Sequence, residues 1–188
     1  ESIQKSEFAG SFFAGLDIGK QMDPSVLVVV QKVGDRRRLV YKHQFPLKTP
    51  YPDVIGHVVR ANQVFDFVSI CVDKTGVGDV IVDELEQEGL SSVNGLVFTD
   101  RWKQEILTYL KLLMEQKLLG FLPDDSVLIS QMNEQQFEYT QPKTAREHVY
   151  MKFWHPLRRH DDQLFALALA CYASKDQEEP FVAVLPIS

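Results

Sequence analysis

The sequence predicts an α/β domain whose mixed central sheet, three antiparallel strands followed by parallel strands, is flanked by helices on both faces. Two observations carry this prediction. The first 45 residues contain three β-rich runs joined by short connections, which is typical of an antiparallel meander. From residue 53 onward, strand-like and helix-like runs alternate, which is typical of βαβ units with parallel strands.

The meander is predicted from three runs near the start of the chain. Apolar runs at 12–17 and 25–32 predict the first two strands, and the continuous VLVVV marks the second as a central, buried strand. Residues 34–35 supply a turn, and a third strand is expected at about 37–45. The tip of this hairpin carries three arginines, Arg36, Arg37 and Arg38.

The alternating part begins with a helix that we expect Asp53 to cap, because apolar residues follow it at near-helical spacing. A buried strand is then predicted at 67–73. The remaining predicted elements are a helix from Gly78 through Leu85, a strand at 93–98, an amphipathic helix at 100–117, one short strand within 127–139, and a last helix at 161–174.

Composition and length fit one globular domain. The chain has 188 residues, 45% hydrophobic and 24% charged, so we expect a single domain over 1–188 with its core at about 12–174 and a peripheral tail at 175–188. No apolar run approaches the roughly 20 residues of a membrane helix and no leader opens the sequence, so a cytoplasmic protein without a membrane partner is expected. Cys71 and Cys171 are expected to be buried free thiols.

Acidic residues stand where apolar elements begin or end. Asp17 closes the first strand, Asp73 closes the strand at 67–73, and Asp161 and Asp162 open the last helix. In the predicted topology the two strands are neighbours, and the largely buried last helix brings its acidic start to the same edge. Carboxylates in such places cost free energy unless a cation uses them, and hard divalent ions prefer oxygen ligands.

Each of these carboxylates also has a structural alternative. Asp161 or Asp162 could cap the last helix, and Asp73 could be a turn residue. Asp17 is harder to explain in this way, because its neighbours in the strand are apolar. The structural alternatives would all have to hold in a fold that brings the acids together, so we favour a metal site.

Basic residues are concentrated just before the last helix, although the whole chain carries a net charge of −6. Between 143 and 160 there are five lysines and arginines against Glu147 alone, as a phosphate-binding rim beside a metal site requires; a solvated loop is the alternative. The candidate DNA contacts are Arg36, Arg37, Lys103, Lys143, Arg146, Lys152, Arg158 and Arg159. Asp23 and His160 are candidate accessory residues, with a turn before Pro24 and a solvated histidine as the alternatives.

This layout is that of an RNase H-like domain, and four segments add a family resemblance. The segments GLDIGKQMDPSVLVVV, VDKTGVGD, DRWKQEILTYLKLLMEQKLLGFLPDD and HDDQLFALALACYA together resemble the nuclease domain of viral large terminase subunits, the DNA-packaging motor proteins. The resemblance spans about 12–174 and implies an endonuclease, related to Holliday-junction resolvases, that cuts concatemeric double-stranded DNA. It also implies three partners: an ATPase domain of the same polypeptide, a small terminase subunit and a portal. In a viral protein it implies the host cytoplasm.

The resemblance implies two Mg²⁺ or Mn²⁺ ions, about 4 Å apart, that activate water and stabilise the leaving oxygen. Asp17 is expected to bridge them, Asp73 to complete one, and Asp162, helped by Asp161, to complete the other. The chain contains no GxxxxGK[ST] phosphate loop, so we expect the ATPase domain to be absent from it.

Three other functions stay open. A junction resolvase shares the acids but needs dimer symmetry and a preference for junctions. The segment GLDIGK also resembles the opening phosphate loop of sugar kinases and actin-like ATPases, whose folds need two such domains. The third is a non-catalytic DNA-binding module that keeps the fold.

Overall fold

The computed structural model describes residues 10–19, 23–90, 92–139, 151–154 and 161–175. The strands are β1 (Ser11–Asp17), β2 (Val26–Val33), β3 (Arg36–Gln44), β4 (Phe67–Asp73), β5 (Val93–Leu96), β6 (Leu119–Gly120), β7 (Gln136–Tyr139) and β8 (Met151–Trp154). The helices are α1 (Tyr51–Phe65), α2 (Gly78–Gln87), α3 (Asp100–Glu115), α4 (Ser126–Glu134) and α5 (Asp162–Ala173).

Six strands form one mixed sheet in the order β5-β4-β1-β2-β3-β6, and β7 and β8 form a separate antiparallel pair. β1, β2 and β3 are antiparallel neighbours, whereas β4 is parallel to β1 and β5 is parallel to β4. The predicted mixed sheet, with its meander followed by parallel strands, is therefore confirmed.

Three local predictions need correction. Asp53 does not cap α1, because the helix already begins at Tyr51 and Asp53 lies in its first turn, where its charge still favours the helix dipole. The short strand expected within 127–139 is confirmed as β7, but the prediction missed α4 before it, which the side chain of Asp125 caps by accepting a hydrogen bond from Leu128 N at 3.2 Å. The short strands β6 and β8 were not predicted, since runs of two and four residues leave little periodicity to detect.

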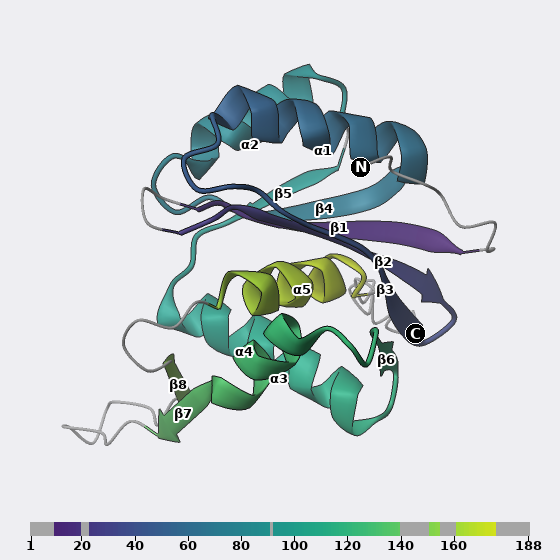
Figure 1. The fold of residues 1–188 in the computed structure, drawn as a ribbon, viewed down its shortest axis with the longest axis vertical. Helices are drawn as coiled ribbons and strands as arrows, with labels where there is room; N and C mark the ends of the chain where they lie inside the picture. Colours follow the sequence, from purple (N-terminus) through teal and green to yellow (C-terminus); the bar gives the residue numbers. More distant parts are fainter. Residues whose placement is uncertain (1–9, 20–22, 91, 140–150, 155–160, 176–188) are drawn as a thin grey trace, which may run out of the picture.

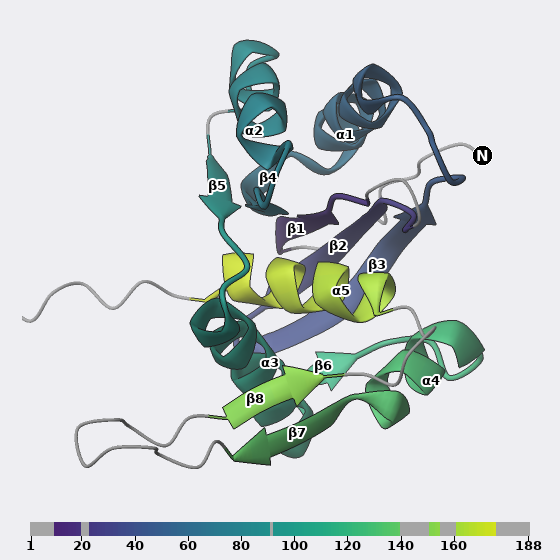
Figure 2. The same ribbon diagram turned by 90° about the vertical axis from the view of Figure 1, so that its left-hand side faces the viewer.

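The helices cover the two faces of the sheet in different ways. Figures 1 and 2 show α1 and α2 on one face and α5 lying directly on the other, with α3 and α4 beyond α5. Each face has its own hydrophobic cluster, one built around α1 and α2 and the other around α5 and α3. Helix α5 is thus sandwiched between the sheet and α3, which fixes its position on both sides.

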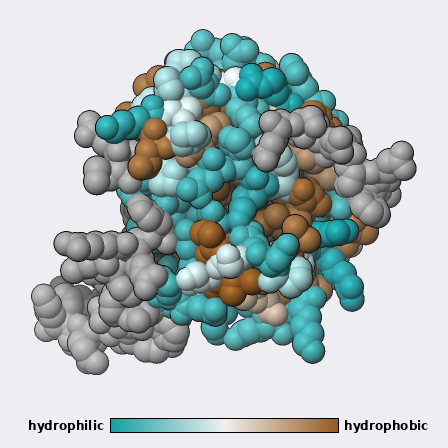
Figure 3. Space-filling model, in the orientation of Figure 1, coloured by the Kyte–Doolittle hydropathy of each residue, from teal (hydrophilic) through white to brown (hydrophobic). Residues whose placement is uncertain are grey.

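The sequence prediction for the two cysteines agrees with the structure. Cys71 and Cys171 are buried free thiols, and burial raises the pKa of each to about 12. Within the described residues, no helix is both long and apolar enough to cross a bilayer. The face drawn in Figure 3 is mainly hydrophilic, with small hydrophobic patches.

Arg37 is not a surface residue, so its predicted contact with DNA is wrong. Its side chain is 5% exposed and is used inside the protein. Its Nε donates to Ser174 Oγ at 3.1 Å, and one terminal nitrogen donates to Ser174 O at 3.1 Å and to Tyr109 Oη at 2.9 Å. Arg37 therefore ties β3 to α3 and to the carbonyl end of α5, where a positive charge is favourable.

Replacing Arg37 with Met is expected to lower the free energy of unfolding by about 3 kcal/mol, because two buried acceptors on Ser174 and a partly buried one on Tyr109 lose their charged donor. The measurement is urea unfolding followed by circular dichroism. The matched control is Arg36→Met at the neighbouring exposed position, which is expected to stay within about 0.5 kcal/mol of the parent. Equal stability of the two variants would contradict the structural role of Arg37.

Candidate metal centre

Strand alternation directs Asp17 and Asp73 to the same face of the sheet. Phe13 in β1 and Cys71 in β4 belong to the hydrophobic cluster around α5. Side chains two or four positions further along a strand point to the same side, so both aspartates face α5. Because Leu16 pairs with Val72 in the parallel ladder, the two carboxylates also end neighbouring strands at the same level. This part of the sequence prediction is confirmed.

Gly15 brings α5 onto β1 at very short distance. A Cβ atom at this position would lie 2.2 Å from Ala166 O and 2.3 Å from Ala170 N. Since Ala173, near the helix end, lines the same hollow as Phe13, α5 runs antiparallel to β1. Its first residues therefore lie at the Asp17 end of the strand, as predicted.

Polar side chains that the sequence analysis missed hold the start of α5. Gln163 is 5% exposed; its Oε1 accepts from Lys42 Nζ at 2.7 Å and its Nε2 donates to Gln44 Oε1 at 2.7 Å. Gln131 Oε1 accepts from Leu164 N at 2.9 Å, which satisfies a free amide of the first helical turn. The only sequence signal was a glutamine directly after two aspartates in an otherwise apolar helix.

The four predicted acids act on one another electrostatically. The pKa of Asp17 is raised well above its ordinary value, first by burial and then by the negative charges of Asp162, Asp73 and Asp161. Lys103 is the charge that acts in the opposite direction. Asp162 is 7% exposed, so its carboxylate also has little access to water. The structure thus brings together acids from three separate elements at one edge of the sheet.

The structural alternative holds for Asp73 but not for Asp161. Asp73 does form the predicted turn, because its Oδ1 accepts from Thr75 N at 2.9 Å and from Thr75 Oγ1 at 2.6 Å. Both bonds use the same oxygen, so with respect to the part of the chain that the structure describes, Oδ2 keeps its lone pairs for another partner. Asp161 occupies the position before α5, yet its side chain makes no capping hydrogen bond. Capping therefore does not account for that residue.

The acid cluster fits a hard divalent cation in chemistry but is not closed around one. Its donors are carboxylate oxygens, and its unbalanced negative charge is what a cation would relieve. Within the described residues, no three acidic, histidine or cysteine side chains already converge as a complete ligand set. Because Mg²⁺ retains much of its water, an incomplete protein ligand set is compatible with binding.

Two other candidate residues that the structure describes, Asp23 and Arg36, do not gather at the cluster. Asp23 is exposed and is not among the charges that act on Asp17. Arg36 lies at the opposite end of the strands, because it pairs with Val33 of β2, and the neighbouring Lys32 pairs with Ser11, at the far end of β1 from Asp17. Six residues of strand separate the two ends, roughly 20 Å. Lys143, Arg146, Arg158, Arg159, His160 and the side chain of Lys152, which belongs to β8, lie outside the described residues.

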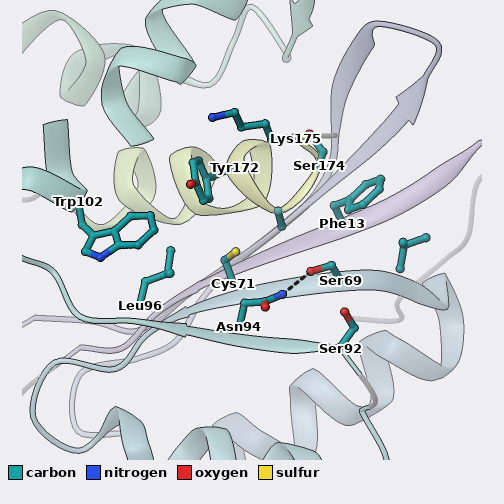
Figure 4. Close-up of a pocket in the computed structure, with 12 residues that line it drawn as sticks. Phe13, Ser69, Cys71, Ser92, Asn94, Leu96, Trp102, Tyr172, Ser174 and Lys175 are labelled. Carbon is teal, nitrogen blue, oxygen red and sulfur yellow. Dashed lines mark hydrogen bonds between the residues drawn. The ribbon is translucent and has the colours of Figure 1, made fainter. Parts of the chain in front are cut away.

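A hollow of about 750 Å³ lies at the other end of α5 from the acids and is distinct from the candidate centre. Figure 4 shows that Cys71, Ser69 and Asn94 line it from the sheet and that Trp102 and Tyr172 line it from the helices. None of the four aspartates lines the hollow. Its lining has no carboxylate to hold a metal, so we place the chemistry at the acid cluster.

Comparison with known proteins agrees with this architecture. No protein-family profile matches the chain. Its sequence is 28% identical over 164 residues to the terminase large subunit of Thermus virus P23-45, covering 86% of this chain and 32% of that protein. The chain therefore spans about a third of the length of this relative.

Solved structures show the same fold. The chain is similar to the magnesium-bound large terminase nuclease of thermophilic phage G20c, with a TM-score of 0.70, 24% identity, and coverage of 90% of this chain and 83% of that one. It is also similar to the manganese-bound nuclease domain of the large terminase g2p of bacteriophage SPP1, with a TM-score of 0.56, 16% identity, and coverage of 88% and 87%. The predicted RNase H-like fold and the resemblance to large terminase subunits are confirmed.

Proposed function

We propose that this chain is the metal-dependent endonuclease domain of a terminase large subunit and hydrolyses phosphodiester bonds of concatemeric double-stranded DNA. The observation that carries this proposal is that Asp17, Asp73, Asp161 and Asp162 lie at one sheet edge, where burial and then the charges of the other three raise the pKa of Asp17. Such a cluster of carboxylates, with one of them strongly perturbed, is typical of functional sites rather than of structural ion pairs. The likeness to terminase nucleases supports the same activity.

The residues have unequal parts in the proposed site. Asp17 stands centrally between β4 and α5 and is the proposed bridge, while Asp73 offers Oδ2 because Oδ1 is held by Thr75. Asp162, buried at the start of α5 and assisted by Asp161, holds the other side. Two Mg²⁺ or Mn²⁺ ions, when bound, would supply water activation and stabilisation of the leaving 3′ oxygen. The network around Gln163 keeps the helix-borne acids in place.

The wider assignments belong to the same proposal. We propose that residues 1–188 form one nuclease domain that works with an ATPase domain of the same polypeptide, a small terminase subunit and a portal. The basic segment at 143–160 and Lys103 are proposed to bind the DNA backbone. These contacts read charge and not sequence, so weak sequence preference is expected.

The test is cleavage of linear plasmid DNA by the purified chain with Mn²⁺, with Mg²⁺ and with EDTA. We expect fragmentation with either ion and none with EDTA. Four-way junctions, assayed in parallel, separate the related activities, because a resolvase would prefer the junction. DNA binding without cutting under any metal condition would contradict the nuclease proposal and would favour a binding module.

A further inference from the structure

Lys103 is held in place by two aromatic rings. It is half-buried in the first turn of α3, a helix capped by Thr99, whose hydroxyl accepts from Trp102 N at 3.3 Å. Its Nζ lies 5.2 Å from the centroid of the Phe165 ring and 5.9 Å from that of Phe98. Both distances are within the range of cation–π attraction, so the two rings favour a fixed position for the ammonium group.

One ring lies on the helix that carries Asp162, and the other is linked to Asp73 through hydrogen bonds. Phe165 belongs to α5 and follows Asp162 by three residues, so the two side chains lie close together on the helix. Phe98 N donates to Thr75 Oγ1 at 3.0 Å, and the same hydroxyl donates to Asp73 Oδ1 at 2.6 Å. The ammonium of Lys103 is therefore anchored between the acidic end of β4 and the acidic start of α5.

The charge of Lys103 acts on Asp17, the central acid of the cluster. Among the groups that act on the pKa of Asp17, three carboxylates raise it and Lys103 lowers it. A positive charge fixed near several carboxylates reduces their mutual repulsion in the protein without metal. The same charge repels any divalent cation that enters the cluster.

We propose that Lys103 is the resident counter-ion of the acid cluster, stabilising the carboxylates in the metal-free protein and opposing the entry of divalent cations. The opposition to metal rests on the proposed function, whereas the counter-ion role in the metal-free protein does not. Once a metal neutralises the acids, the ammonium is available to a DNA phosphate, which lysine binds as a point charge. Lys103 would thus link metal loading to DNA binding.

A double-mutant cycle in EDTA tests the counter-ion role. Lys103→Met keeps the unbranched stem over the rings and removes the charge. In the parent chain it is expected to lower the Tm by about 2–4 °C, and in the Asp17→Asn background by clearly less. An equal fall in both backgrounds would mean that the lysine acts only by packing, and would overturn the proposal.

Calorimetric titration with Mn²⁺, without DNA, tests the opposition to metal. Lys103→Met is expected to bind Mn²⁺ about tenfold more tightly than the parent, and Lys103→Arg, which keeps the charge, about as tightly as the parent. The control is Lys111→Met on the same helix, an exposed lysine paired with Glu115 at 2.8 Å, which is expected to change neither Tm nor affinity by a comparable amount.

The two proposals fail in different ways. If the parent chain binds no Mn²⁺ but the cycle shows coupling between Lys103 and Asp17, the metal site is wrong and the counter-ion role stands. Suppose instead that the parent chain binds Mn²⁺, that the cycle shows no coupling between Lys103 and Asp17, and that Lys103→Met leaves the affinity for Mn²⁺ unchanged. The inference about Lys103 is then wrong and the metal site stands.

Discussion

Replacing Asp17 with Asn is expected to abolish metal-dependent DNA cleavage and, at the same time, to stabilise the metal-free protein. Loss of a bridging ligand should lower the cleavage rate by about 10³-fold or more, equivalent to about 4 kcal/mol of transition-state stabilisation. Stability should rise by about 0.5–2 kcal/mol, because the neutral amide does not repel Asp73 and Asp162. If Asp17 served only in packing, the substitution would cause neither the loss of DNA cleavage nor the gain in stability.

The stability gain has a defined dependence on pH. The pKa of Asp17 in the folded protein is raised above its ordinary value of 3.8, so the folded state holds this proton more tightly than the unfolded state. As pH rises above about 3.8, folding therefore loses stability, until the folded carboxyl has also ionised. The Asn variant lacks this loss. Its Tm in EDTA should exceed that of the parent at pH 8, and the difference should shrink toward pH 4.

The matched control is Asp83→Asn, an exposed aspartate on α2 on the opposite face of the sheet. It is expected to keep full cleavage activity and to leave the pH dependence of Tm unchanged. Thermal unfolding at the two pH values and plasmid cleavage with Mn²⁺ give both readouts. If the Asp17→Asn variant cleaved DNA as fast as the parent, Asp17 would not be part of the site.

Local patterns in the sequence were sufficient for the parts of the fold with strong periodicity. The predicted strand at 67–73 coincides with β4, and the strand at 12–17 and the helix at 161–174 match β1 and α5 to within a residue at each end. The meeting of Asp17 with Asp73 also followed from topology, because the strand after a right-handed crossover lies parallel to and near the first. These predictions required only the order of elements along the chain.

Side-chain partners far apart in sequence could not be predicted. Arg37 stands in a run of three arginines, and its burial depends on Ser174, 137 residues later. Charged residues are almost never fully buried without a partner, so surface exposure was the reasonable expectation. Lys103 likewise looked like an ordinary exposed lysine, because its contact with Phe98 and Phe165 exists only once α3 has packed on α5.

Replacing Gly15 with Ala is expected to destabilise the protein strongly, because the added methyl group has no room between β1 and α5. The new Cβ would lie 2.2 Å from Ala166 O and 2.3 Å from Ala170 N, both backbone atoms of α5. Neither can rotate away like a flexible side chain, so the helix must shift by about an ångström or the pair must separate. We expect the free energy of unfolding to fall by about 3 kcal/mol or more.

The same substitution should also damage the site. α5 carries Asp162 toward Asp17, so a shift of the helix changes the spacing of the two acids, and a misplacement of about 1 Å can cost about 100-fold in rate. The comparison is Gly56→Ala in α1, where the new Cβ meets only Arg60 Nη1 at 3.4 Å. That variant should gain about 0.5–1 kcal/mol, as a helix-interior glycine replaced by alanine usually does.

Urea unfolding of both glycine variants, with Mn²⁺ titration of whatever remains folded, separates packing from chemistry. A Gly15→Ala protein that is destabilised but binds Mn²⁺ like the parent would mean that α5 packs as described without positioning the metal ligands. A variant with parental stability would mean that α5 does not lie against β1. Gly15 is two residues from Asp17, and Ala166, which it approaches, lies about one turn of α5 after Asp162. The close approach at this glycine therefore links the packing of the core to the geometry of the acids.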